Sequence, residues 1–218
     1  MTSDEVKDVA AKWSFDANKC TKSLYEISKV ENLRPGGRSH CLENKRAGTR
    51  TAIWFDEVMA YWTNLEELQT QNKALPHRID GCYVKGRDIY LIEFKADGDW
   101  SSLKDVLWAK FHDGYSQLIG RKIISMEEAK SHLYYIVVSS VLLKYGPDDI
   151  VKTVSKAKKA ELFLAITNRI SDYVQRPWKY SEILPKANLR KLTAFSCQAT
   201  YTLDISQFDR FVMESQWT

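Results

Sequence analysis

The sequence lacks the long apolar stretch that a membrane-spanning helix requires. No run approaches the roughly 18 consecutive apolar residues needed to cross a bilayer. Residues 1–12 are polar and lack the cationic start and apolar middle of a secretory signal. We also find no internal repeat and no low-complexity linker. These absences lead us to expect a cytoplasmic protein in which residues 1–218 form a single domain.

Cysteine is scarce, and its spacing excludes two further classes of protein. The four cysteines lie far apart, and no two of them form a Cys-x-x-Cys pair; they are Cys20, Cys41, Cys82 and Cys197. This spacing argues against a zinc site and against a disulfide framework. We therefore expect four small, buried, apolar side chains.

Composition is that of an ordinary globular protein, with 44% apolar and 28% charged residues. The formal net charge is +4. A charge of this size is compatible with a polyanionic partner but does not by itself indicate one.

Hydrophobic patterning predicts an α/β fold with a mixed central β-sheet flanked by helices. Residues 1–19 are expected to be loosely held or helical. The expected helices cover residues 49–69, 101–118 (capped by Ser101 or Ser102), 148–170 and 206–214. The expected strands cover residues 22–30, 78–84, 88–96, 132–141 and 199–205, with a poorer strand pattern at 40–45.

The strands at 78–84 and 88–96 are separated by Gly86-Arg87, a two-residue hairpin turn with glycine first. Lys85 then pairs with Asp88, and counting back along both strands places Asp80 directly across from Glu93. Strand alternation puts Lys95 on the same face as Glu93. The hairpin therefore predicts a cluster of two acids and one lysine.

The pattern Glu-x-Lys also occurs elsewhere in the chain, so the setting of Glu93 and Lys95 is what distinguishes them. They lie in Ile89–Ala96, an otherwise apolar strand. Burying a carboxylate and an ammonium there costs several kcal/mol unless they pair with each other or bind an ion.

Side chains directly opposed on paired strands have Cβ atoms roughly 4.5–5.5 Å apart. Two carboxylates at that distance repel each other unless a cation lies between them. Mg²⁺ is suited to the position, since it typically takes one or two carboxylates together with water and phosphate oxygens. An ammonium from Lys95 could orient the attacking water or stabilise charge on a phosphate. This arrangement favours hydrolysis of a phosphodiester.

An Asp on one strand and Glu-x-Lys on its hairpin partner, here Asp80 and Glu93-Phe94-Lys95, resembles the PD-(D/E)XK nuclease superfamily. The resemblance covers about residues 50–140, as helix, hairpin, helix and strand. It implies a restriction-endonuclease-like core, with Asp80 and Glu93 as ligands of Mg²⁺ (or Mn²⁺ as a substitute) and Lys95 as the catalytic lysine. The proline that the family places before the Asp is missing, because Ile79 precedes Asp80.

Many members of that superfamily contribute an acid from the helix before the hairpin. Glu57 fits this position as a third metal ligand, with Asp56 as its rival, although an exposed acid at the edge of the apolar stripe is an equally good interpretation.

On the helix after the hairpin, a polar row borders the core stripe and can face the site. We assign a functional role to Lys110 and Gln117 in this row. For Asp113 we prefer an ion pair with Lys110 at the solvent edge.

The sequence thus predicts a metal-dependent nuclease, with a DNA endonuclease of the restriction, phage-defence or repair type preferred over an RNA-cleaving enzyme. A homodimer would supply two sites for a duplex. The core is expected at about 49–141, with 1–48 and 171–218 as elaborations of unknown role. One alternative is a catalytically inactive nucleic-acid-binding or regulatory protein on the same fold. Another is a non-catalytic interaction protein in which Glu93 and Lys95 form a structural ion pair.

Overall fold

The computed structural model describes residues 1–29, 41–42, 44–63, 76–95, 100–139 and 189–217. The expected helix at 148–170 lies outside these residues, as does most of the expected strand and turn region at 34–45. Within the described ranges, no helix has the length and apolar character needed to cross a membrane.

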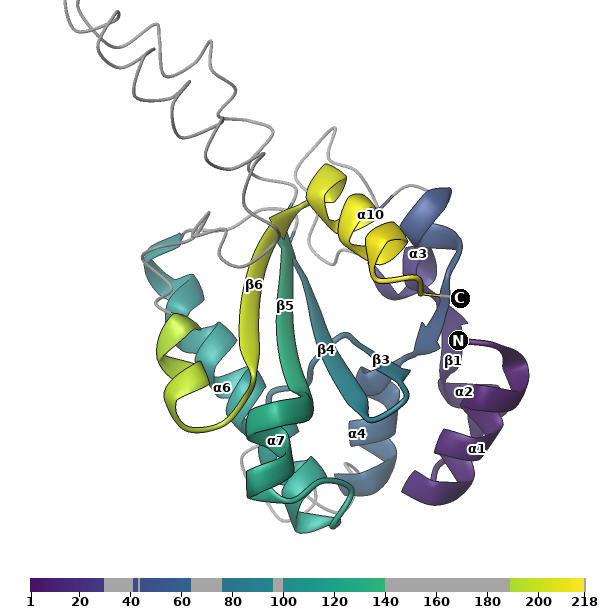
Figure 1. The fold of residues 1–218 in the computed structure, drawn as a ribbon, viewed down its shortest axis with the longest axis horizontal. Coiled ribbons are helices and arrows are strands. Elements are labelled where there is room, and N and C mark those ends of the chain that lie inside the picture. The colour runs from purple at the N-terminus through teal and green to yellow at the C-terminus, as the bar shows by residue number, and fades with distance from the viewer. Residues whose placement is uncertain (30–40, 43, 64–75, 96–99, 140–188, 218) are drawn as a thin grey trace, which may run out of the picture.

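The described residues form one mixed six-stranded sheet with the strand order β1-β2-β3-β4-β5-β6 (Figure 1). Neighbouring strands from β1 to β4 are antiparallel, whereas β4, β5 and β6 are parallel to one another. The strands are β1 (Thr21–Ser23), β2 (Thr51–Ile53), β3 (Gly81–Lys85), β4 (Asp88–Lys95), β5 (Leu133–Ser139) and β6 (Ala199–Asp204). An α/β fold with a mixed sheet flanked by helices is therefore confirmed.

Helices precede, connect and follow these strands. They are α1 (Ser3–Trp13), α2 (Ala17–Cys20), α3 (Leu24–Ile27), α4 (Phe55–Thr63), α6 (Trp100–Gly120), α7 (Met126–His132) and α10 (Ile205–Glu214), with 3-10 turns η1 (Arg46–Thr49) and η4 (Leu189–Ala194).

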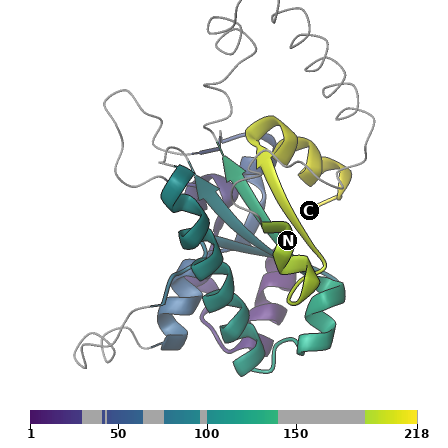
Figure 2. The same ribbon diagram turned by 90° about the vertical axis from the view of Figure 1, so that its left-hand side faces the viewer.

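Alternate residues of β4 face opposite layers of the molecule, as strand geometry requires. Phe94 packs edge-on against Phe208 of α10, with ring centroids 6.0 Å apart. On the other face, Tyr135 of β5 packs against Phe111 of α6, and its hydroxyl donates to the Leu107 carbonyl at 3.3 Å. Figure 2 shows the strands lying between α6 and α10.

The hairpin has the predicted register. Lys85 pairs with Asp88 and Gly81 pairs with Ile92, so the position next to Gly81 falls opposite Glu93. Gly86 adopts a positive φ of 61°, which a residue with a side chain rarely adopts and a glycine takes readily. The turn sequence therefore determines which side chains meet at the far end of the hairpin.

Two expectations about the first third of the chain are wrong. Residues 22–30 were expected to form one strand, but β1 ends at Ser23, which caps α3 through a capping box with Glu26. Residues 49–69 were expected to form one helix, but Thr51–Ile53 pairs with β1 and β3, and α4 begins only at Phe55. Pairing with neighbouring strands outweighs the local helical pattern at this point.

Other element boundaries also differ from expectation. Helix α6 is Trp100–Gly120, so Ser101 and Ser102, one of which was expected at the cap position, lie within the helix. Helix α7 was not predicted, although Ser125 and Glu128 form a capping box at its start.

The sheet and the hydrophobic core include residues on both sides of 49–141, the range expected for the nuclease core. At one side, α1 contributes Val6, Ala10 and Trp13 to the buried core. At the other, β6 pairs with β5 along its whole length, and α10 buries Phe208. Both ends of the chain therefore belong to the same sheet and core.

Candidate active site

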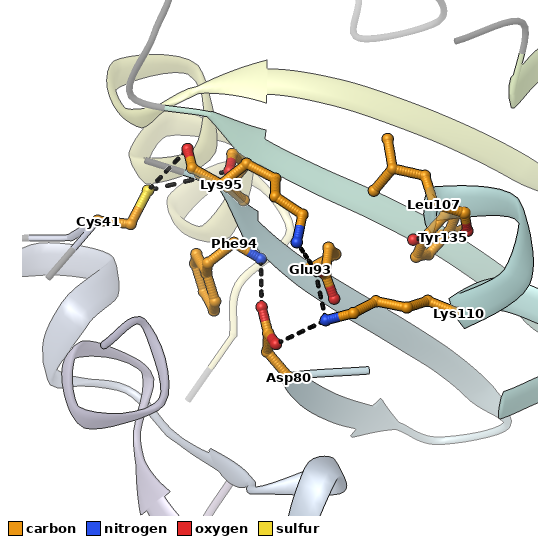
Figure 3. Close-up of polar contacts among 9 residues, drawn as sticks. Cys41, Asp80, Glu93, Phe94, Lys95, Leu107, Lys110 and Tyr135 are labelled. Atoms are coloured by element: carbon orange, nitrogen blue, oxygen red, sulfur yellow. Dashed lines mark hydrogen bonds and ion pairs between the residues drawn. The ribbon is translucent and has the colours of Figure 1, made fainter. Parts of the chain in front are cut away.

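Four charged side chains meet on the α6 face of the hairpin (Figure 3). Asp80 directly precedes β3, Glu93 and Lys95 lie two residues apart on β4, and Lys110 comes from α6. Strand alternation explains why Glu93 and Lys95 point to one side, and the register explains why Asp80 joins them.

Both lysines contact the same oxygen of Glu93. Lys110 Nζ lies 2.7 Å from Glu93 Oε1, and Lys95 Nζ lies 2.5 Å from it. Lys110 Nζ also lies 3.3 Å from Asp80 Oδ1, so that one ammonium bridges the two carboxylates. The cluster therefore contains two negative and two positive charges.

The cluster is closed on the Glu93 side and open on the other. The Glu93 side chain is 0% exposed, whereas Asp80 is 24%, Lys95 20% and Lys110 17% exposed. Glu93 Oε2 is buried and has no hydrogen-bond partner among the described residues. A buried carboxylate oxygen without a partner is costly, and such an atom in a native structure calls for an explanation.

The second oxygen of Asp80 is held by the backbone. The Phe94 N–H donates to Asp80 Oδ2 at 2.7 Å, which anchors the carboxylate to β4. Burial raises the pKa of the Asp80 carboxyl to about 7, and the neighbouring charge of Glu93 acts in the same direction. Lys110, Lys95 and the Phe94 N–H oppose this rise.

Lys110 remains charged in this setting. Burial alone would lower its pKa, but the charges of Glu93 and Asp80 and their hydrogen bonds outweigh burial and raise the pKa above its ordinary value. The buried Tyr135 hydroxyl is kept protonated, because burial first, and then the charges of Glu93 and Asp80, raise its pKa. Both groups therefore act as donors at neutral pH.

Of the two neighbouring acids at the start of α4, Asp56 is the one that interacts electrostatically with this cluster. Its carboxylate accepts from Arg78 Nε at 3.1 Å. Burial raises the pKa of the Asp56 carboxyl. The positive charges of Arg78 and Lys110 oppose this rise, and the negative charge of Glu93 adds to it. Asp56 is therefore within electrostatic reach of the site. Glu57 instead raises the pKa of the Cys20 thiol. Asp56, the rival in the sequence analysis, is thus the acid of α4 that interacts with the charges of the site.

The polar side chains expected along one face of α6 make different contacts. Lys110 points into the cluster, while Asp113 Oδ2 accepts from the backbone N–H of His77 at 2.6 Å. Gln117, one turn further along, makes no side-chain hydrogen bond to the cluster within the described part of the chain. The expected ion pair between Lys110 and Asp113 is replaced by these two separate contacts.

Two carboxylates are a sufficient protein contribution for Mg²⁺, which usually keeps several waters. The described residues contain no group of three or more His, Cys, Asp or Glu side chains placed to hold a metal ion. The unpartnered Glu93 Oε2 nevertheless provides a hard oxygen donor on the closed side of the cluster, and the partly exposed Asp80 provides one on its open side. The residues present therefore fit a magnesium-type ion with few protein ligands, and they do not fit a zinc site.

Two features of the site were not predicted from the sequence. The anchoring of Asp80 by the Phe94 N–H is a backbone contact, which side-chain patterns do not reveal. Cys41 also reaches the end of β4, where its Sγ lies 3.9 Å from the carbonyl oxygens of Lys95 and Val138 (Figure 3). No signal in the sequence around Cys41 indicates this contact.

Comparison with known proteins gives no match to the chain among protein-family models, curated proteins or solved structures.

Proposed function

We propose that this protein is a metal-dependent nuclease that hydrolyses phosphodiester bonds at the cluster of Asp80, Glu93 and Lys95. The observation that carries the proposal is the state of Glu93. It is fully buried in an apolar strand beside a second acid, and one of its oxygens has no partner among the described residues. A divalent ion would satisfy that oxygen and reduce the repulsion between the two acids.

In this proposal Asp80 and Glu93 hold Mg²⁺ or Mn²⁺. When bound, such an ion supplies positive charge that stabilises a phosphodiester during its hydrolysis. Glu93 is fixed by burial, and Asp80 is fixed by the Phe94 N–H, so neither carboxylate has to be ordered when the ion binds.

Lys95 is placed to act on the water or the phosphate. Its ammonium contacts Glu93 Oε1, and a fifth of its side chain is exposed. It can therefore donate hydrogen bonds toward the open side of the cluster while its position is set by Glu93.

The order of elements around the cluster adds support. Helix α4, the β3–β4 hairpin, helix α6 and strand β5 come in the order on which the resemblance to PD-(D/E)XK nucleases was based, with α7 inserted between α6 and β5. DNA is proposed as the substrate over RNA on that resemblance alone. A homodimer is proposed as the form that would cut both strands of a duplex.

One observation favours a second candidate. The charges of the two lysines already balance those of the two acids, as in a structural ion cluster. A protein that binds nucleic acid or regulates a partner without turnover could retain such a cluster. Activity and ion binding distinguish the two candidates.

The test begins with ion binding. Native protein freed of metal by a chelator is titrated with Mn²⁺ in a calorimeter, beside Asp80→Asn, Lys95→Ala and the control Glu127→Gln. Asparagine is chosen because its carbonyl can still accept from the Phe94 N–H. Loss of supporting contacts alone costs about 10- to 100-fold in metal affinity, so loss of the Asp80 charge should weaken Mn²⁺ binding by about 100-fold or more. Glu127 is exposed on α7, and its variant should bind Mn²⁺ like the native chain.

Supercoiled DNA, single-stranded DNA and single-stranded RNA are then incubated with the same proteins and Mg²⁺. We expect cleavage by the native chain and by Glu127→Gln, and a loss of about 100-fold or more for Lys95→Ala. Mn²⁺ binding without cleavage of any of the three substrates would favour the non-catalytic candidate. Absence of Mn²⁺ binding would refute the proposal.

A further inference from the structure

Lys110 Nζ occupies a position between the two acids that are the proposed ion ligands. It lies 2.7 Å from Glu93 Oε1 and 3.3 Å from Asp80 Oδ1. An ion bound by the same two carboxylates would lie roughly 2.0–2.1 Å from its oxygen ligands. The ammonium and such an ion would therefore be close neighbours of like charge.

The charge balance leads to the same conclusion. With both acids ionised, Asp80 and Glu93 together carry two negative charges, and Lys95 and Lys110 carry two positive charges. A divalent ion added to the intact cluster leaves it with an excess of two positive charges in a partly buried place. Movement of one ammonium toward solvent reduces that excess.

Lys110 has a route by which its ammonium can move. It comes from α6, and its side chain is 17% exposed. Side chains on a helix lean toward its N-terminus, and Val106, one turn in that direction, is 37% exposed. The ammonium therefore has a short route from the cluster to water.

Lys95 differs from Lys110 in its contacts. Within the described ranges its ammonium contacts Glu93 and no other carboxylate, whereas the Lys110 ammonium contacts both Glu93 and Asp80. Lys110 is thus the lysine that fills the place of a bridging cation, and Lys95 stands beside it.

We propose that Lys110 is an internal competitor of the divalent ion, whose ammonium bridges Asp80 and Glu93 until an entering ion displaces it toward solvent. This inference rests on the proposed function, since it requires that the two acids bind an ion. It assigns Lys110 a regulatory role: the lysine holds the acids together at low ion concentration and sets the concentration at which the site is loaded.

The test compares Mn²⁺ affinity, measured by calorimetry, among variants that remove one ammonium each. Lys110→Met keeps a long unbranched side chain without the charge. Lys95→Met removes the ammonium that contacts one acid, and Lys130→Met removes an exposed lysine on α7 as a control. A nearby opposite charge changes the affinity of a carboxylate for a cation by roughly tenfold or more. We expect Lys110→Met to bind Mn²⁺ about tenfold or more tightly than the native chain, Lys95→Met to gain less, and Lys130→Met to gain nothing.

A second measurement uses the native chain and does not depend on how well a variant folds. The Lys110 side-chain nitrogen signal is observed by NMR and assigned through its absence from Lys110→Arg. On saturation with Mg²⁺ we expect this signal to shift and the attached hydrogens to exchange faster with water, because the ammonium leaves its two carboxylate partners.

The outcomes separate the inference from the proposed function. If the native chain binds the ion while Lys110→Met binds it no more tightly, or if the Lys110 signal stays unchanged at Mg²⁺ saturation, only the competitor role is refuted. If neither the native chain nor Lys110→Met binds Mn²⁺, both proposals fail. Binding by Lys110→Met but not by the native chain would refute the proposed function for this chain, and the competitor role with it, because no entering ion then displaces Lys110.

Discussion

The Phe94 N–H donates to the Asp80 carboxylate at 2.7 Å, so that Asp80 continues the pairing of β3 with β4 through its side chain. The backbone ladder of β3 begins at Gly81, one residue later. Because an unpaired buried N–H costs about 1–3 kcal/mol, we expect Asp80→Ala to be less stable than Asp80→Asn by about that amount. Urea unfolding at pH 7 in the presence of a chelator measures the difference.

The Asp80→Asn variant lacks the charge but keeps an acceptor, so the comparison isolates the hydrogen bond from the electrostatics. Equal stability of the alanine and asparagine variants would mean that the Phe94 N–H finds another partner and that Asp80 is not anchored by β4.

The raised pKa of Asp80 predicts a pH dependence of folding stability without divalent ions. The folded-state pKa of about 7 lies above the ordinary value of 3.8. The folded chain therefore holds this proton more tightly than the unfolded chain, and stability falls as pH rises from about 4 through 7 before the effect levels off. Asp80→Asn cannot lose this proton, so its stability relative to the native chain should rise over the same window.

Urea midpoints of both proteins at half-unit steps from pH 4 to 8, with a chelator present, give this comparison. Titrating groups remote from the cluster contribute alike to both chains and cancel in the difference. A difference that does not change with pH would show that Asp80 titrates near its ordinary value.

The four cysteines are buried thiols, as the sequence predicted. Burial raises the pKa of the Cys20 thiol to about 11 and that of Cys197 to about 12, and it raises the pKa of Cys82 as well. Since the thiolate is the reactive form, a thiol reagent at pH 8 should react with these cysteines only as the protein unfolds. Mass spectrometry before and after addition of urea measures the extent of labelling, and complete labelling of the folded chain would contradict the burial.

Asp56 and Glu57 offer a matched pair of substitutions. Asp56 interacts electrostatically with Lys110 and Glu93, whereas Glu57 acts on Cys20. We expect Asp56→Asn to change Mn²⁺ affinity by about tenfold, in the range typical of supporting partners, and Glu57→Gln to leave it within about twofold, a difference of under 0.5 kcal/mol. Calorimetric titrations of both variants decide between them, and a larger effect at Glu57 would restore the assignment made from the sequence.

Gly114 allows α6 to approach the segment that carries Asp80. A Cβ added there would lie 2.5 Å from Ile79 Cδ1 and 3.7 Å from Phe55 Cε1. Because overpacking a core costs about 1–3 kcal/mol, Gly114→Val should lower the free energy of unfolding by about that much and weaken Mn²⁺ binding through the displaced Asp80. Gly120, which has open space around it, supplies the control Gly120→Val.

The parts of the fold that were predicted correctly depend on local signals. Gly86 and Arg87 determine the hairpin turn, and the turn determines the register. The long apolar run of β5 and the strand and helix at the C-terminal end of the chain were also predicted within a few residues. Thr51–Ile53 was assigned to a helix because its strand character comes from pairing with β1 and β3, which no short window reveals. Helix α7 buries only Ala129, so its apolar pattern is weak.

For the candidate site, too, local patterns allow some residues to be predicted and not others. Asp80, Glu93 and Lys95 come together because a strand repeats every two residues and the register is fixed. Lys110 follows from the helical phase of α6. The sequence does not decide whether Asp56 or Glu57 faces the site. Neighbouring residues on a helix point about 100° apart, so the answer depends on where α4 begins. The structure places that start at Phe55 rather than Thr49.

The two acids and two lysines of the cluster carry charges that cancel, and one of the four side chains is completely buried. Removing a single partner from such a group leaves an uncompensated charge, whereas exchanging the whole group for apolar side chains of similar volume is often tolerated. These four positions are therefore tied to one another in any redesign of the protein. A stable variant without these charged side chains should be obtained by replacing all four together. The intermediates with one or three replacements should be the least stable members of the series.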